Sequence, residues 1–308
     1  MADAMHPVAC GLTPPAQVAT RKVLAQWGVR PRQLRRLGGN RNAHWIVTTA
    51  EGQYVLRCYR PDRDRAAIEY EFAVLEYLSG KGWPVACPIG ELRTWRGRTF
   101  AMFPRLTGRP RLDHDSAKRQ RERGGLLAEL HQDLATLDLG QRSRWQATDQ
   151  FLLAEAERIV AGAQRRLSHV PLLRDILVTQ TGLARTAVAE HTGHLPRSVV
   201  HGDFVGWNLL WRQGRLVGVI DFDDVRLDLR AADVACARRR RSDQVVAGYA
   251  AVSRLAEDEV ALLDTLWRAY TLVFVADLLR ARTLTAPVVA ALEWCATQLT
   301  TTRPAQPW

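Results

Sequence analysis

The stretch SVVHGDFVGWNLLWRQGRLVGVIDFDD, residues 198–224, decides how this chain is expected to fold. Its polar octet HGDFVGWN, residues 201–208, is typical of a loop, and two short apolar strands joined by a turn follow it. The second strand ends at Asp221. The pattern therefore predicts that Asp203, Asn208 and Asp221 lie together at the mouth of one small hairpin.

Such a cluster indicates chemistry, because buried carboxylates repel one another unless a cation or hydrogen-bond donors neutralise them. The oxygens of Asn208 and Asp221 suit Mg²⁺ and not zinc. Asp203 precedes Asn208 by five positions, so the loop can aim it to accept the proton of an attacking hydroxyl. The spacing H-x-D-x-x-x-x-N, followed by a strand that delivers D-F, is that of the catalytic and metal loops of the kinase fold.

Working outward, the first hundred residues mix strands and helices. The patterns predict a helix over 13–27, two strands within 44–60 joined at Glu51-Gly52, a helix over 64–80, and strands over 86–92 and 98–103. From Gly108 the pattern becomes helical, apart from the 198–224 stretch. Helices are expected over 115–136, 148–167, 171–191, 255–280 and 285–300, and a hinge over 102–110.

Composition excludes several classes of protein. With 47% hydrophobic and 24% charged residues, the 308-residue chain is typical of a soluble globular protein. Its N-terminus has no signal-peptide pattern, and its most apolar helix, 265–284, is interrupted by Arg268, Asp277 and Arg280, so no membrane association is expected. Five scattered cysteines without a CxxC pair indicate reduced thiols and a cytoplasmic location.

The formal net charge of +11 raises the question of nucleic-acid binding. Basic residues cluster at 30–36, 118–123 and 237–241, but no basic-aromatic motif, helix-turn-helix signature or zinc-knuckle spacing accompanies them. Dedicated nucleic-acid binding is therefore not expected. An arginine-rich solvated surface that suits anionic ligands in general is the better interpretation.

Three motifs together resemble a known family: His201-Gly202-Asp203 with Asn208, then Ile220-Asp221-Phe222-Asp223, then Asp233-Val-Ala. The chain resembles, over most of its length, the aminoglycoside phosphotransferase and choline-kinase-like small-molecule kinases, whose fold is related to that of protein kinases. The resemblance implies an α+β, bilobal protein-kinase-like fold. Residues 1–103 would form a small β-rich nucleotide-binding N-lobe with one main helix. Residues 104–308 would form a larger, mostly helical C-lobe with the catalytic loop and the acceptor site.

The resemblance also implies roles for the C-lobe residues. Asp203 would be the catalytic base, and His201 would organise its loop. Asn208 and Asp221 would hold Mg²⁺, with Asp223 as a second metal contact. Asp233 is expected to hold the loop backbone or cap the next helix, whereas His131 is expected to be packed and not catalytic. No role is assigned to Trp207.

In the N-lobe, the family's phosphate-binding cation falls on Arg57, where protein kinases have lysine. Arginine keeps the charge but changes the geometry from a point charge to a planar fork. Glu71 best matches the acidic partner on the helix, and Glu69 stays open as the alternative because the two differ by a modest helix rotation.

The remaining nucleotide contacts implied by the resemblance fall into three groups. Gly38, Gly39 and Asn42 would form the loop over the phosphates, although no GxGxxG pattern is present. Met102, Phe103 and Arg105 lie in a segment, 102–106, that resembles the linker whose backbone hydrogen-bonds a purine. Val55, Leu210 and Ile220 would form apolar walls around the base.

The expected function is Mg²⁺-dependent transfer of the γ-phosphoryl of ATP or GTP to a hydroxyl of a small molecule, such as an antibiotic, an amino alcohol or a sugar. The basic net charge argues weakly against a polycationic aminoglycoside. Two alternatives stay open: a catalytically silent nucleotide-binding regulatory protein of the same fold, and a metal-dependent phosphohydrolase. The absence of GxxxxGK[ST] excludes a P-loop NTPase at the level of motifs. The sequence indicates no oligomeric state.

Overall fold

A five-stranded antiparallel sheet forms the base of the smaller lobe in the computed structural model, which describes residues 17–37, 42–112, 116–239 and 243–301. The strand order is β1-β2-β3-β5-β4. The strands are β1 (Gln33–Leu37), β2 (Ala43–Thr48), β3 (Gln53–Cys58), β4 (Arg93–Trp95) and β5 (Arg98–Pro104). The predicted hairpin within 44–60 is thus β2 and β3, joined through Gly52.

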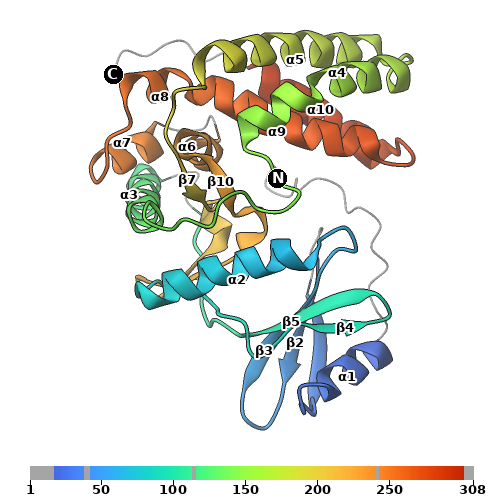
Figure 1. Cartoon of the computed structure of the whole chain (residues 1–308), viewed down its shortest axis with the longest axis vertical. Coiled ribbons are helices and arrows are strands. Elements are labelled where there is room, and N and C mark those ends of the chain that lie inside the picture. The colour runs from blue at the N-terminus through green and yellow to red at the C-terminus, as the bar shows by residue number, and fades with distance from the viewer. Residues whose placement is uncertain (1–16, 38–41, 113–115, 240–242, 302–308) are drawn as a thin grey trace.

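The two faces of this sheet belong to different cores, because successive side chains of a strand point in opposite directions. One face packs on α1 (Gln17–Ala25), where Val23 and Leu24 meet Trp45, Leu56 and Met102. The opposite face carries Arg57, and it is turned toward the larger lobe (Figure 1).

Helix α2 (Arg65–Gly80) lies between the sheet and the larger lobe (Figure 1). Asp64 caps its start by accepting a hydrogen bond from Ala67 N at 2.8 Å. Its apolar stripe recurs at helical spacing, and Ile68 and Leu75 pack with Leu127 of the larger lobe in one core. The buried face of α2 therefore belongs to the core of the larger lobe.

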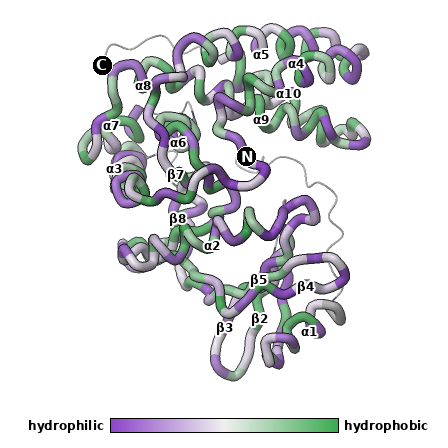
Figure 2. The backbone as a smooth tube through the Cα atoms, in the orientation of Figure 1, coloured by the Kyte–Doolittle hydropathy of each residue, from purple (hydrophilic) through white to green (hydrophobic). Residues whose placement is uncertain are grey.

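The larger lobe is mainly helical. Its helices are α3 (Ala117–Leu134), α4 (Thr148–Arg166), α5 (Pro171–His191), α6 (Arg230–Arg238), α7 (Gln244–Ala250), α8 (Glu257–Ala261), α9 (Leu263–Arg280) and α10 (Ala286–Thr300). Helices α4, α5, α9 and α10 bury a second apolar core. Hydrophobic and hydrophilic segments alternate along the helices, as expected of helices with one buried face (Figure 2).

Helices α3 and α7 cross at very short range because each presents a glycine at the contact. A Cβ at Gly124 would lie 2.0 Å from Val245 O, and one at Gly248 would lie 2.0 Å from Arg121 O. Only glycine fits these two positions, so the crossing fixes α3 against the segment that follows α6.

Two small sheets hold the 198–224 stretch. Strand β7 (Arg197–Val200) pairs antiparallel with β10 (Arg226–Leu229), and β8 (Leu209–Arg212) pairs antiparallel with β9 (Arg215–Val219). The short β6 (Arg109–Pro110) pairs with β8. The loop 201–208 and the segment 220–224 therefore leave the two small sheets next to each other, as the sequence predicts.

Some predicted elements are wrong in detail. Residues 86–92 form no strand; Pro88 lacks an N–H to donate, and Gly90 turns the chain with φ +65°. The helix expected over 255–280 is divided into α8 and α9. Helices α6 and α7 were not predicted, because segments of nine and seven residues are too short for a clear period. No helix in the described part of the chain combines the length and apolarity needed to cross a bilayer.

Candidate active site

The backbone of loop 201–208 is held by one buried carboxylate, that of Asp233 in α6. His201 N and Gly202 N each donate to Asp233 at 3.0 Å, and His131 Nε2 lies 3.1 Å from it. Burial alone would raise the pKa of Asp233, but the hydrogen bond and charge of His131 hold that pKa below its usual range. The prediction that Asp233 holds the loop backbone is confirmed. His131 is packed, as expected, and its other nitrogen contacts Tyr249 Oη.

Gly202 lets this loop approach the segment 220–224. Its φ is +82°, and a Cβ there would lie 2.5 Å from Asp224 O. Both the backbone conformation and the space therefore require glycine next to Asp203.

Both carboxylate oxygens of the buried Asp203 accept hydrogen bonds. Asn208 Nδ2 donates to Oδ2 at 3.1 Å, and Arg239 Nη2 donates to Oδ1 at 2.8 Å. Asn208 Nδ2 also donates to Asp203 O at 2.9 Å, which fixes the amide. No described residue donates to Asn208 Oδ1, so this oxygen is available as a ligand.

The His201 ring lies inside the loop and stiffens it. Its Nδ1 accepts from Asp203 N at 3.2 Å, so Nε2 carries the proton that is directed to Ile220 O, also at 3.2 Å. Burial lowers the pKa of His201, which keeps the ring neutral. The ring thus ties the Asp203 loop to the end of β9.

Asp221 stands at the end of β9 in a left-handed backbone conformation, with φ 68° and ψ 58°. A non-glycine residue in this region carries a backbone cost of about 1–2 kcal/mol, and such residues gather at functional sites. Burial, and then the charge of Asp223, raises the pKa of Asp221 to about 7. In the described ranges no side chain or backbone group donates a hydrogen bond to its carboxylate.

These observations fit a magnesium ion. Among the described residues, no group of three or more His, Cys, Asp or Glu side chains is arranged to hold a metal by itself. Mg²⁺ is commonly bound by one or two protein oxygens, with phosphates and water completing its shell. The unpaired carboxylate of Asp221 and the free Oδ1 of Asn208 provide such a donor set.

On the sheet side, Arg57 faces this cluster. Its Nη1 lies 2.6 Å from Glu71 Oε1, and its Nε lies 3.1 Å from His44 Nε2. Burial alone would lower the pKa of Arg57, but Glu71 and the neighbouring acidic groups raise it above its ordinary value. Glu69, the alternative left open by the sequence, pairs with Arg65 on the exposed side of α2.

Asp223, expected as a second metal contact, has other partners in the structure. Its carboxylate accepts from Asn42 Nδ2 at 2.6 Å and lies 3.5 Å from nitrogens of both Arg57 and Arg63. Asn42, expected in the loop over the phosphates, is instead buried, and its Oδ1 accepts from Arg60 N. Asp223 therefore joins the two lobes.

The structure divides the residues expected around the purine. Val55 and Phe103 are paired in the sheet, and the Arg57 guanidinium lies 5.2 Å from the Phe103 ring centroid. Met102 points into the α1 core on the opposite face, and Arg105 N donates to Gln53 O. Leu210 is buried and Ile220 is half-buried at the β8–β9 hairpin. Gly38 and Gly39 lie outside the described residues.

Sequence reasoning missed Arg142, which is fully buried between the lobes. Its Nη1 donates to Asp223 O and Val225 O, each at 2.8 Å, and its Nε donates to Ala67 O of α2 at 2.9 Å. Burial, and then the nearby charge of Arg63, lowers the pKa of Arg142 to about 10. No sequence signal distinguishes this arginine, because all three acceptors are more than seventy residues away.

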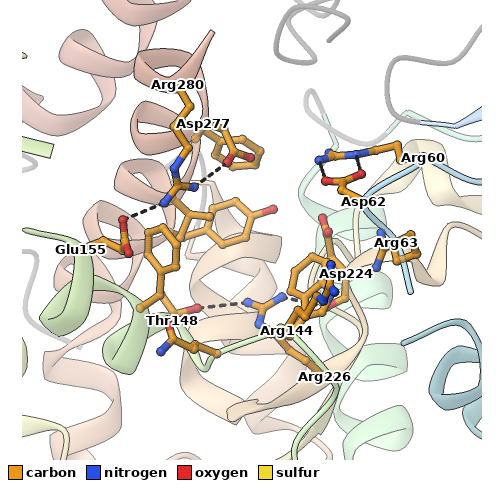
Figure 3. Close-up of a pocket in the computed structure, with 16 residues that line it drawn as sticks. Arg60, Asp62, Arg63, Arg144, Thr148, Glu155, Asp224, Arg226, Asp277 and Arg280 are labelled. Atoms are coloured by element: carbon orange, nitrogen blue, oxygen red, sulfur yellow. Dashed lines mark hydrogen bonds and ion pairs between the residues drawn. The ribbon is translucent and has the colours of Figure 1, made fainter. Parts of the chain in front are cut away.

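A cavity of about 440 Å³ opens beside this centre, between the segment after β3 and helices α4 and α9 (Figure 3). Its wall carries charges of both signs and several aromatic rings: Arg60, Asp62, Arg63, Arg144, Trp145, Gln146, Thr148, Phe151, Glu155, Asp224, Arg226, Tyr270, Val273, Phe274, Asp277 and Arg280. Asp224 O packs against Gly202, the residue before Asp203, and Tyr270 lies close to Cys236, whose Sγ is 4.0 Å from Asp203 Oδ1. The cavity therefore lies near Asp203, which is not itself one of its lining residues.

The fold and the site define a class. A small antiparallel sheet with a buried arginine–glutamate pair stands over a helical lobe whose loop carries an Asp and an Asn beside a strand-end Asp. These are the parts of a protein-kinase-like phosphotransferase. The chain belongs to the phosphotransferase enzyme family, whose pattern matches residues 33–284.

Known relatives agree with this assignment. The homoserine kinase of Chelativorans sp. (strain BNC1) is 29% identical over 269 residues, which cover 77% of this chain and 76% of that protein. A microcompartment-associated aminopropanol kinase has a similar structure, with a TM-score of 0.66, 19% identity and coverage of 92% and 95% of the two chains. A thermostable mutant of aminoglycoside phosphotransferase APH(4)-Ia, in ternary complex with ADP and hygromycin B, has a TM-score of 0.62, 18% identity and coverage of 91% and 96%.

The predicted family and the predicted bilobal, protein-kinase-like fold are therefore confirmed. The chain is an enzyme, a small-molecule kinase of the phosphotransferase family.

Proposed function

We propose that this enzyme transfers the γ-phosphoryl of ATP or GTP to a hydroxyl of a small molecule, with Asp203 as the base. The convergence of Asp203, Asn208 and Asp221 beside Arg57 carries the proposal. Nucleotide use is supported by the ADP in the ternary complex of APH(4)-Ia, a structural neighbour.

Each residue has a role in this reaction. Arg57, oriented by Glu71, would bind the α- and β-phosphates through its planar fork. Asp203 would orient the acceptor hydroxyl and take its proton as the new P–O bond forms. Asn208 and Asp221 would hold Mg²⁺, whose charge lowers the electrostatic cost of gathering the phosphates. Most of the rate enhancement would then come from positioning and charge stabilisation.

For the acceptor, we propose a small molecule with both an ammonium and a carboxylate, of the size of homoserine. The cavity beside Asp203 supports this choice, because its arginines and acidic residues offer partners for both groups. The homoserine kinases among the relatives support it independently. A polycationic antibiotic fits less well, since the five arginines on the same wall outnumber its four acidic residues.

Two other functions predict different outcomes. A regulatory protein without transfer activity would not need the intact Asp203, Asn208 and Asp221. A phosphohydrolase would release phosphate from ATP without an acceptor.

We also propose a cytoplasmic location, supported by the free thiols of Cys58, Cys87, Cys236 and Cys295.

The test is an ADP-release assay over chemically varied hydroxyl compounds, with and without Mg²⁺. We expect ADP release that requires both Mg²⁺ and an acceptor, with hydroxy amino acids as the best acceptors. Nucleotide binding without stimulation by any acceptor would support the regulatory function. Phosphate release that is independent of acceptors would support the phosphohydrolase.

A further inference from the structure

Arg239 occupies an unusual position for a cation, because it pairs directly with the proposed base. Its Nη2 lies 2.8 Å from Asp203 Oδ1. Asn208 donates to the other carboxylate oxygen. An acceptor hydroxyl that approaches Asp203 therefore meets a carboxylate already engaged on both sides.

Arg239 stands where the chain leaves α6, and its side chain lies over an aromatic ring. Arg239 follows the last turn of α6 with φ 46° and ψ 37°; its N–H donates to Ala235 O at 3.1 Å, and the chain leaves the helix after it. The guanidinium lies 4.2 Å from the centroid of the Trp207 ring, a flat surface over which an arginine can shift without losing contact.

Arg239 is also incompletely satisfied. Its Nε is buried, and no hydrogen-bond partner for it exists among the described residues. A buried donor without a partner costs about 1–3 kcal/mol, and an anion that reached it would remove that cost. The Nε–H and an Nη–H of one guanidinium point in parallel, which matches the two oxygens of a carboxylate.

We propose that Arg239 is a specificity-determining residue that binds the carboxylate of the acceptor and, in doing so, releases Asp203. Without an acceptor, the guanidinium is held on Asp203. When an acceptor carboxylate enters, the guanidinium exchanges one carboxylate for the other, and Asp203 Oδ1 becomes free for the acceptor hydroxyl. This inference rests on the proposed function, and it restricts the acceptors to hydroxy acids.

The position of the cavity supports an acceptor and not a nucleotide as the source of the anion. Tyr270 lines the cavity and lies close to Cys236, whose Sγ is 4.0 Å from Asp203 Oδ1, the oxygen that Arg239 engages. The phosphate-binding side of the site lies at Arg57, which contacts Glu71 and Asp223 and has no contact with Arg239 in the described structure. The loop 201–208 thus has a nucleotide side and an acceptor side, and Trp207 supports the latter.

The test measures binding by calorimetry on the full-length protein saturated with Mg²⁺ and AMP-PNP. Three probes separate the groups of the acceptor: L-homoserine, 4-hydroxybutyrate, which lacks the amine, and 3-amino-1-propanol, which lacks the carboxylate. The variants are Arg239→Gln, which removes the charge, and Arg239→Lys, which keeps the charge without the fork. Arg185→Gln, on the exposed side of α5, is the matched control.

We expect Arg239→Gln to weaken the binding of L-homoserine and 4-hydroxybutyrate by about tenfold or more. That is the expected effect of losing one charge-assisted hydrogen bond. Its affinity for 3-amino-1-propanol should change less than about threefold. Arg239→Lys should be intermediate, and Arg185→Gln should match the wild type. Thermal unfolding of each variant establishes that it is folded.

Three results for Arg239→Gln would overturn the inference. These are an equal loss of affinity for all three probes, no loss of affinity for the two carboxylates, or weaker binding of AMP-PNP. Failure of the wild type to bind either carboxylate would also overturn it. The proposed function is tested separately, by ADP release from ATP with the same probes. Binding of homoserine without ADP release would contradict phosphoryl transfer but would leave the carboxylate assignment intact.

Discussion

Asn208 Nδ2 donates to Asp203 Oδ2 at 3.1 Å, so the two side chains that sequence spacing predicts as ligand and base are hydrogen-bonded to each other. The bond has a directional consequence. Because the amide nitrogen is turned toward Asp203, its oxygen is turned away and can serve a different partner. Asn208 therefore orients the proposed base, and its oxygen stays available for the proposed Mg²⁺.

This arrangement predicts that Asp203→Asn and Asp221→Asn fail in different ways. Asp203→Asn should lower kcat by about 10²–10⁴-fold, the usual contribution of a general base, with nucleotide affinity within a few-fold of the wild type. Asp221→Asn should mainly weaken Mg²⁺-dependent nucleotide binding, because it removes the carboxylate ligand. Nucleotide titrations at varied Mg²⁺ and ADP-release assays check both. Near-native turnover of Asp203→Asn would show that the base is wrongly assigned.

The pairing of Arg57 with Glu71 predicts that Glu71→Gln impairs nucleotide use. Loss of this buried charge leaves Arg57 less firmly oriented, so KM for ATP should rise about tenfold. Glu69→Gln is the matched control, since Glu69 lies on the same helix and pairs with the exposed Arg65. It should stay within about twofold of the wild type. Equal effects of the two substitutions in steady-state kinetics would contradict the assignment.

The contacts of Asp223 predict a role in joining the lobes. Asp223→Asn weakens its pairing with Arg57 and Arg63, so the free energy of unfolding should fall by about 3 kcal/mol, as for a broken buried ion pair. Asp62→Asn, whose side chain is 61% exposed beside Arg60, should change the unfolding free energy by less than about 1 kcal/mol. Urea denaturation measures both. If Asp223→Asn instead weakens Mg²⁺ binding as strongly as Asp221→Asn does, Asp223 is a metal ligand after all.

His44 predicts a pH dependence of stability. Burial, and then the charge of Arg57, lowers the pKa of His44 to about 4. Between pH 6.5 and pH 4 the unfolded chain binds a proton at this position and the folded protein does not, so this histidine makes the fold less stable as the pH falls through that window. His44→Gln should remove that contribution, and Gln keeps an acceptor for Arg57 Nε.

The measurement is urea denaturation of the wild type and of His44→Gln at about pH 7 and about pH 5, on either side of the ordinary histidine pKa. The variant should lose less stability than the wild type between these two pH values. His191→Gln, at the exposed end of α5, is the matched control. A larger loss in His44→Gln than in the wild type would show that the protonated ring is tolerated.

The sequence predicted which side chains the local chain brings together. Asp203, Asn208 and Asp221 lie within one hairpin and its loop. Chain connectivity alone therefore limits how far apart their side chains can be. Glu71 also carried a readable signal. It follows Ile68 by three residues and precedes Leu75 by four, so it shares their buried face, and Glu69 does not.

The contacts made by distant residues could not be predicted. Arg63, Arg142 and Arg239 reach their partners across 160, 81 and 36 positions, respectively. In a chain with 43 lysines and arginines, nothing local separates these three from the solvated ones. The same limit applies to Asn42, whose partner Asp223 is 181 positions away.

Helix α2 lies in the N-terminal part of the chain, but its contacts attach it to the helical lobe. Arg142 donates to Ala67 O, and Tyr77 Oη donates to Asp133 O of α3 at 2.9 Å, so α2 is fastened to the helical lobe. The sheet with α1 is joined to this unit through the Arg57–Glu71 pair and through the contacts of Asp223 with Arg57 and Asn42, so a tilt of the sheet would have to break them. We therefore expect amides of α2 to exchange hydrogen as slowly as those of α3. We also expect the Arg57–Glu71 ion pair to separate when the proposed nucleotide site opens.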